Sequence, residues 1–337
     1  MKSHTSSRKN MMRPRKRFGE QAPPAIFSLI LGLFGLTLAW RAAALELPVP
    51  LAISELLLGG VTGLFALALM AYMAKFMRRP ATMLEDLRVL PGRGGLAALA
   101  VCVSALSTGL IAISEGLASA VMWVALGFHI VMTGLVIYTL LSGPREQRQV
   151  TPIWHLSFVG VIVTAVSAVT LGHFALAALI LWVTLVLALI IYAVSAYQLA
   201  TRIAPAPLRP LLAIHLAPAS LFTTVALGFP AADYPLMPLI AQVSLAVAVL
   251  IGLALLFNIR SITAAGFSPM WASFTFPISA FTSALLTFGH VAGSQIALML
   301  GAVMLAAASG VVGYVAFKVI RMWLNGQLAI KTNAAKA

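Results

Sequence analysis

The chain has little charge and very little acid. Of its 337 residues only 9% are charged and only eight are Asp or Glu, whereas 61% are apolar. With a mean hydropathy of +1.01, this composition excludes an ordinary soluble fold. A net charge of +14 would suggest nucleic-acid binding in a soluble chain, but here the basic residues fall between long apolar runs. The sequence therefore predicts an integral membrane protein whose basic residues set its topology, with no nucleic-acid partner.

Reactive and ionisable groups are equally scarce inside the apolar runs. The single cysteine, Cys102, allows no intramolecular disulfide, and no histidine pair has a credible metal spacing, so we expect no metal and no cofactor. No Asp, Glu, Lys or Arg lies in the middle of a run, which argues against a proton-coupled pump. The absence of a P-loop excludes ATP-driven transport by this chain alone. The sequence also contains no visible nucleophile–base pair, so an enzyme is not expected.

What the chain does have is ten apolar stretches, each long enough to cross roughly 30 Å of hydrocarbon. Continuous apolar runs of this length predict helices and not barrel strands. They lie near 24–44, 53–76, 93–114, 118–141, 151–172, 173–198, 209–229, 236–258, 268–289 and 294–318. We expect an all-α membrane protein with a basic N-terminal segment (1–22), a ten-span domain (23–320) and a C-terminal tail (321–337). The first stretch is longer than a signal-peptide core, which favours a retained span.

The basic residues predict the orientation. Twenty-one of the 22 Lys and Arg residues lie on one side of the predicted spans and only Arg41 on the other, which predicts that both termini are cytoplasmic. The odd-numbered stretches begin near 24, 93, 151, 209 and 268, so a helix hairpin of constant orientation repeats at intervals of 58 or 59 residues after a longer first interval of 69. Such a repeat predicts five hairpins around a central pore.

Hydroxyl residues favour the odd-numbered stretches. Ser and Thr are about twice as frequent there as in the even-numbered stretches, and they follow helical spacing, as in Ser157, Gly160, Thr164 and Ser167. Such a stripe can line a pore, or it can be a helix–helix contact. We take as pore-lining candidates Ser104, Ser107, Thr108, Ser157, Thr164, Ser167, Pro218, Ser220, Thr223, Ser279 and Ser283.

Three short motifs carry a family resemblance. Trp40 closes the first stretch, Leu216-Ala217-Pro218-Ala219 lies in the seventh, and Trp271-Ala272-Ser273-Phe274-Thr275-Phe276-Pro277 begins the ninth. In these motifs, and over about residues 22–324, the chain resembles the tellurite-resistance/dicarboxylate transporter family, which includes bacterial TehA, fungal malate and sulfite carriers and plant slow-type anion channels.

The resemblance implies a homotrimer with one pore in each protomer, formed by the odd helices and gated by a phenylalanine. The matching residue here is Phe276, beside the helix-bending Pro277. The chain lacks the prolines that relatives often have early in the first, third and fifth spans, where Ile30, Val103 and Ser157 stand.

The leading hypothesis is therefore an anion channel or transporter of the TehA type in the bacterial inner membrane, moving small anions such as tellurite or a C4-dicarboxylate. Hydroxyls would donate to a passing anion without holding it tightly. A cytoplasmic ring of Lys75, Arg78, Arg79, Arg145 and Arg202 would concentrate anions at one mouth, although fixing topology explains it too. His215 lies three residues before Pro218 on a predicted pore helix. It either faces water in the pore, where it would make transport depend on pH, or it has a hydrogen-bonded packing role. The alternative function is a non-conducting integral-membrane structural or assembly protein.

Overall fold

The computed structural model describes residues 19–337, and in this range every regular element is a helix. Within these residues nine helices are long and apolar enough to cross a membrane, and a shorter apolar pair covers His155–Thr170. The all-α prediction is confirmed. The tenth span remains a prediction, because the fifth apolar stretch is split into two short helices.

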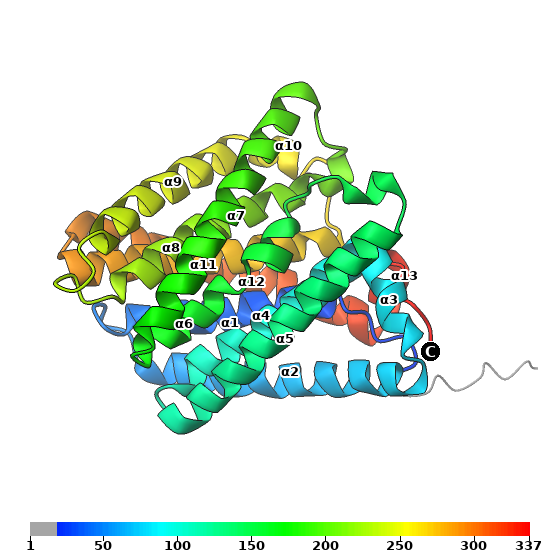
Figure 1. The fold of residues 1–337 in the computed structure, drawn as a ribbon, viewed down its shortest axis with the longest axis horizontal. Helices are drawn as coiled ribbons and strands as arrows, with labels where there is room; N and C mark the ends of the chain where they lie inside the picture. The colour runs from blue at the N-terminus through cyan, green and yellow to red at the C-terminus, as the bar shows by residue number, and fades with distance from the viewer. Residues whose placement is uncertain (1–18) are drawn as a thin grey trace, which may run out of the picture.

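Two sets of helices differ in position. The inner set comprises α1 (Ile26–Ala43), α4 (Leu90–Leu110), α6 (Ile162–Thr170), α8 (Leu216–Leu227) and α11 (Ala272–Ala292). The outer set comprises α2 (Leu51–Arg78), α5 (Glu115–Ser142), α7 (Phe174–Thr201), α9 (Met237–Phe257) and α12 (Gln295–Leu324). The inner helices contact one another in a closed order, α1 to α4, α6, α8, α11 and back to α1. Each outer helix packs against the inner helix that precedes it in the chain, and in Figure 1 α2 and α9 lie at opposite borders of the bundle.

Burial separates the same two sets. In the four long inner helices 67–78% of the most apolar segment is buried, against 17–33% in the outer helices. Each outer helix buries one narrow stripe, for example Leu58, Val61, Phe65 and Ala68 on α2. Its remaining surface carries exposed leucines, valines and aromatic rings. Such a surface is suited to lipid and not to water.

Three inner helices begin with an irregular turn. A π-helical turn, η2 (His155–Val159), precedes α6, and 3-10 turns η3 (Ala206–His215) and η4 (Pro269–Trp271) precede α8 and α11. Pro210 lies inside η3 and donates no backbone hydrogen bond there, and η4 begins at Pro269. The stripe of Ser157, Gly160, Thr164 and Ser167 predicted for one regular helix is therefore interrupted after Val159.

The end of the bundle where the inner helices begin is tied together by short elements: α3 (Ala81–Arg88), η1 (Arg145–Arg148), α10 (Ile259–Ile262) and α13 (Gln327–Lys331). Figure 1 shows α3, α13 and the C-terminus at one end of the bundle. Lys75 and Asp86 form a fully buried ion pair of 2.6 Å, and the N–H of Ala335 donates to the same carboxylate. The C-terminal tail thus packs onto the helical domain at this end.

Candidate functional site

Two cavities lie inside the ring of inner helices, one near each end. We name them the Met270 cavity and the Arg41 cavity after one lining residue of each. The Met270 cavity is lined by residues at the starts of the inner helices, including Ala25, Pro91, Ile153 and Leu211. The Arg41 cavity is lined by residues near the ends of the same helices, including Thr108, Thr170 and Thr224. The five inner helices therefore run in the same direction.

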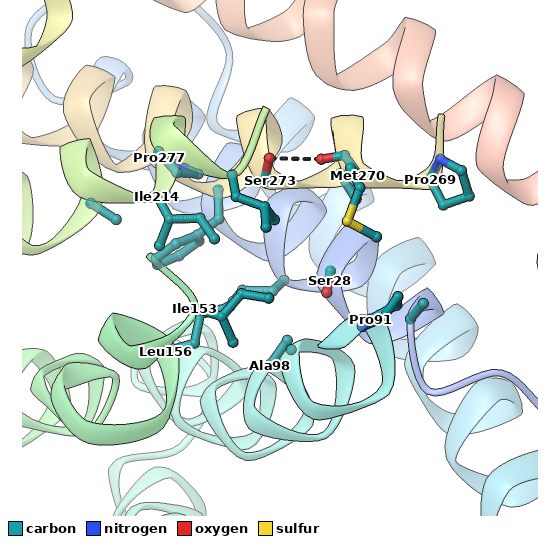
Figure 2. A pocket seen from close by; sticks show the side chains of 17 residues that line it. Ser28, Pro91, Ala98, Ile153, Leu156, Ile214, Pro269, Met270, Ser273 and Pro277 are labelled. Carbon is teal, nitrogen blue, oxygen red and sulfur yellow. Dashed lines mark hydrogen bonds between the residues drawn. The ribbon is translucent and has the colours of Figure 1, made fainter. Parts of the chain in front are cut away.

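The Met270 cavity is small and apolar. Its volume is about 50 Å³, room for a few water molecules at most. In Figure 2, Met270 and Ile153 point into it from opposite sides. Of its two hydroxyls, Ser273 donates to the carbonyls of Met270 and Pro210. Ser28 makes no hydrogen bond to any other described residue.

The Arg41 cavity is wider and more polar. Its volume is about 310 Å³, and its lining includes one guanidinium and five hydroxyl groups. These polar residues are Arg41 on α1, Thr108 on α4, Thr170 on α6, Thr224 on α8, and Ser283 and Thr287 on α11. Every inner helix therefore contributes a polar side chain to this cavity.

Phe276 lies between the two cavities. It lines both of them, and it also lines a third space of about 20 Å³ next to Pro218 and His155. The side chain is 6% exposed. The side chain of Phe276 thus forms part of the wall of all three spaces inside the ring of inner helices.

The position of Phe276 depends on α1 and on Pro277. A Cβ placed on Gly35 would lie 3.0 Å from ring atom Cδ2 of Phe276, so a larger residue there would require the phenyl ring or α1 to shift by a few tenths of an ångström. One turn earlier, a Cβ on Gly32 would lie 1.9 Å from Oγ1 of Thr275. Pro277 has no N–H, so the α11 backbone is weakened beside the ring. Close packing holds the ring while the backbone next to it lacks one hydrogen bond.

The predicted pore-lining residues fall into three groups. Thr108 and Ser283 line the Arg41 cavity, and Pro218 lines the small third space. Two hydroxyl pairs join α4 to α6, Ser104 with Thr164 and Thr108 with Ser167, each at 2.8 Å. The remaining residues are Ser107, Ser157, Ser220, Thr223 and Ser279, none of which lines one of these three spaces.

Two members of the third group, Ser107 and Thr223, serve contacts between helices. Ser107 donates to the carbonyl of Ala118 on α5, and Thr223 approaches that of Ala241 on α9, so both face outer helices. Ser220 and Ser279 donate to carbonyls of their own helices. Ser157 is buried, and its hydroxyl has no partner among the described residues. The hydroxyl stripes therefore serve both cavity lining and helix packing.

The histidines form one pair that the spacing did not indicate. Nε2 of His155 lies 3.0 Å from Nδ1 of His215, and the hydroxyl of Tyr192 donates to the backbone carbonyl of His215. Both imidazoles are buried. His129 is also buried, whereas His290 pairs with Glu46 at the surface. Within residues 19–337 no group of three potential ligands could hold a metal ion.

One residue of the predicted cytoplasmic ring of basic residues, Lys75, is buried and not exposed at the end of the bundle. Lys75 is fully buried against Asp86, so its charge is neutralised and does not act at an open mouth. Arg79 pairs with Glu85 and donates to the carbonyl of Lys336. Arg145 and Arg202 are exposed.

Four polar residues of the Arg41 cavity were not among the pore-lining candidates: Arg41, Thr170, Thr224 and Thr287. Thr287 did belong to the regular helical spacing of Phe276, Ser279 and Ser283 in the ninth stretch. Two of them carried a usable signal, because Thr224 and Thr287 follow Ser220 and Ser283 by one helical turn and extend the same stripes. Arg41 was recognised only as the exception to the charge asymmetry.

Comparison with known proteins gives one family match. A family model described as voltage-dependent anion channel matches residues 21–320. No curated protein matches the chain.

Proposed function

The chain belongs to the voltage-dependent anion channel family, and from this premise we propose that it conducts small anions through the ring of inner helices, along a path that Phe276 closes in this structure. The family consists of anion channels and transporters, and the chain is a multi-pass membrane protein. The path within the ring and the gating role of Phe276 are our proposal.

One observation carries this proposal: Phe276 lines the cavities on both of its sides. Among the described residues, no other residue lines both the Met270 cavity and the Arg41 cavity. Because the cavities occupy opposite ends of the same five helices, removal of the ring would join them. The ring would thus act as the barrier of a single passage.

The residues that line the proposed passage are suited to an anion that binds weakly enough to be released again. No charged side chain lines the Met270 cavity, and hydroxyls predominate among the polar groups of the Arg41 cavity. The inner helices begin around the Met270 cavity, so the positive ends of their dipoles face it. An anion would be attracted there without the tight hold of a buried cation.

Finer features rest on the resemblance and on the charge asymmetry. We propose a bacterial inner-membrane protein with cytoplasmic termini, a homotrimer with one pathway in each protomer, and tellurite or a C4-dicarboxylate among the anions. The alternative, a structural or assembly protein, draws support from the hydroxyl pairs between α4 and α6, which are helix contacts.

Anion flux in proteoliposomes tests the gate. Phe276→Ala should raise flux per folded protein by at least tenfold, because the ring no longer forces the anion to shed water at the constriction. Phe276→Leu should give an intermediate value. The matched control is Phe281→Ala on the same helix, because Phe281 is also buried but packs in the cluster containing Leu216 and Leu245.

The control variant should lose stability, by about 3–5 kcal/mol for a buried phenylalanine, without a gain in flux. Equal flux in wild type and well-folded Phe276→Ala would remove Phe276 from the gate. Absence of flux in both would favour the structural alternative.

A further inference from the structure

The polar side chains of the Arg41 cavity form a ring around one end of the proposed path. We propose that Arg41, together with Ser283 and Thr287, binds a small monovalent inorganic anion in this cavity. The inference rests on the proposed conduction path, and it adds a binding step at the end of the chain's inner helices. Phe276 also lines this cavity.

The position of Arg41 suits anion binding. Arg41 is in the last turn of α1, and its Nη1 donates to the carbonyl of Gly109 on α4 at 2.9 Å. This single hydrogen bond fixes the guanidinium across the seam between two inner helices. The other terminal nitrogen, Nη2, has no hydrogen-bond partner in residues 19–337. A guanidinium has five N–H donors, so donors remain for a ligand.

The charge of Arg41 is not cancelled by a direct ion pair. No carboxylate of the described residues lies within 4 Å of its guanidinium. Glu55 interacts with it only at longer range, and the nearby Glu46 pairs with His290. No other charged residue lines the cavity.

The hydroxyls of the cavity differ in what they can donate. Thr108, Thr170 and Thr224 each donate to a backbone carbonyl one turn earlier in their own helix. Their protons are therefore engaged. Ser283 and Thr287 make no hydrogen bond to any residue of the described range, and they lie one turn apart on α11. These two hydroxyls are free to donate to an anion.

The backbone field at this end opposes an anion. The inner helices end around the Arg41 cavity, so the partial negative charges of their last carbonyls gather there. Without a cation the cavity would repel anions from the path. Arg41 supplies one positive charge at this place, which balances the charge of one monovalent anion.

A purely structural role for Arg41 would be a cap on the α4 carbonyl of Gly109, and substitutions can separate the two roles. Arg41→Gln keeps a donor for that carbonyl but removes the charge, whereas Arg41→Lys keeps the charge. Ser283→Ala removes one free hydroxyl with little change in volume. Arg260→Gln is the matched control, because Arg260 is exposed on α10 and lines none of these cavities.

Nitrate is the probe, exchanged for gluconate at constant ionic strength. Binding is read from the rise in thermal midpoint of the purified protein in detergent, and transport from the nitrate dependence of flux in proteoliposomes. Arg41→Gln should raise the half-saturating nitrate concentration about tenfold in both assays, the effect of one close charge. Arg41→Lys and Arg260→Gln should stay near wild type, and Ser283→Ala should lie between.

Results that overturn this inference differ from those that overturn the conduction path. If wild type transports nitrate and folded Arg41→Gln has the same half-saturating concentration, the binding site is wrong and the path stands. A loss in Arg41→Lys equal to that in Arg41→Gln would also contradict it. If nitrate binds through Arg41 but no variant conducts, the site stands and the proposed path fails.

Discussion

The inner and outer helices differ in a way that reverses the rule for soluble proteins. The outer helices α2, α5, α7, α9 and α12 are all more apolar than the long inner helices, yet they are the exposed set. In water the most apolar segments would be buried. In a bilayer the lipid solvates the most apolar segments. The segments that become buried are therefore those with small and hydroxyl-bearing residues. The inner set can then surround a path for a polar solute.

Glycines on the inner and outer helices differ in the same way, because an inner glycine is closely packed and an outer one is not. Substituting an inner glycine gives the largest expected effect on stability. Gly32 on inner α1 lies directly against α11, and an added Cβ would lie 1.9 Å from Thr275 Oγ1. Gly32→Ala should lower the unfolding free energy by about 3 kcal/mol, the upper range for overpacking. Thermal unfolding in detergent measures this.

Its control is Gly59→Ala on outer α2, where nothing lies within 4 Å of an added Cβ. That variant should be unchanged or more stable by about 0.5–1 kcal/mol, because alanine favours the helix. Equal stability losses in the two variants would show that the inner helices are not the more closely packed set.

A smaller effect is expected at the hydroxyls. Ser104→Ala on α4 would leave the buried hydroxyl of Thr164 without its partner, at a cost of about 1 kcal/mol. Ser142→Ala on outer α5 removes an exposed hydroxyl that bonds only to its own helix, and its effect should stay within about 0.5 kcal/mol. The same unfolding assay compares them, and a larger loss for Ser142→Ala would contradict the assignment of Ser104 to a helix contact.

Much of the fold was predictable from the sequence because lipid imposes a simple pattern. The long apolar runs gave the all-α class, and nine of the ten predicted stretches coincide with long helices. The family resemblance, carried by Trp40 and the motifs around Pro218 and Pro277, is confirmed by the match over residues 21–320.

The fifth stretch and the site were harder to predict. The π-helical turn at His155–Val159 has no proline within it and no distinct sequence pattern. Ser107 and Thr223 were chosen because they are hydroxyl residues in odd-numbered stretches, but the sequence does not show whether such a residue faces a lumen or a neighbouring outer helix. The pairing of His155 with His215 needs tertiary structure, because 60 residues separate them. Arg41 was noted only as the exception to the charge asymmetry, because a position at the end of a span does not show whether the side chain reaches into a cavity.

The most direct test of the central claim asks from which side each cavity can be reached. Cysteine would be introduced at Ser28 in the Met270 cavity or at Ser283 in the Arg41 cavity, in a Cys102→Ala background. A small anionic, membrane-impermeant thiol reagent would be added to one side of oriented vesicles. With Phe276 present, we expect Ser28→Cys and Ser283→Cys to react from opposite sides.

With Phe276→Ala added, each cysteine should react from both sides, because the two cavities then form one passage. Phe281→Ala should leave the sidedness unchanged. If each cysteine still reacts from only one side in the folded Phe276→Ala protein, the ring does not separate two halves of one path, and the account is contradicted.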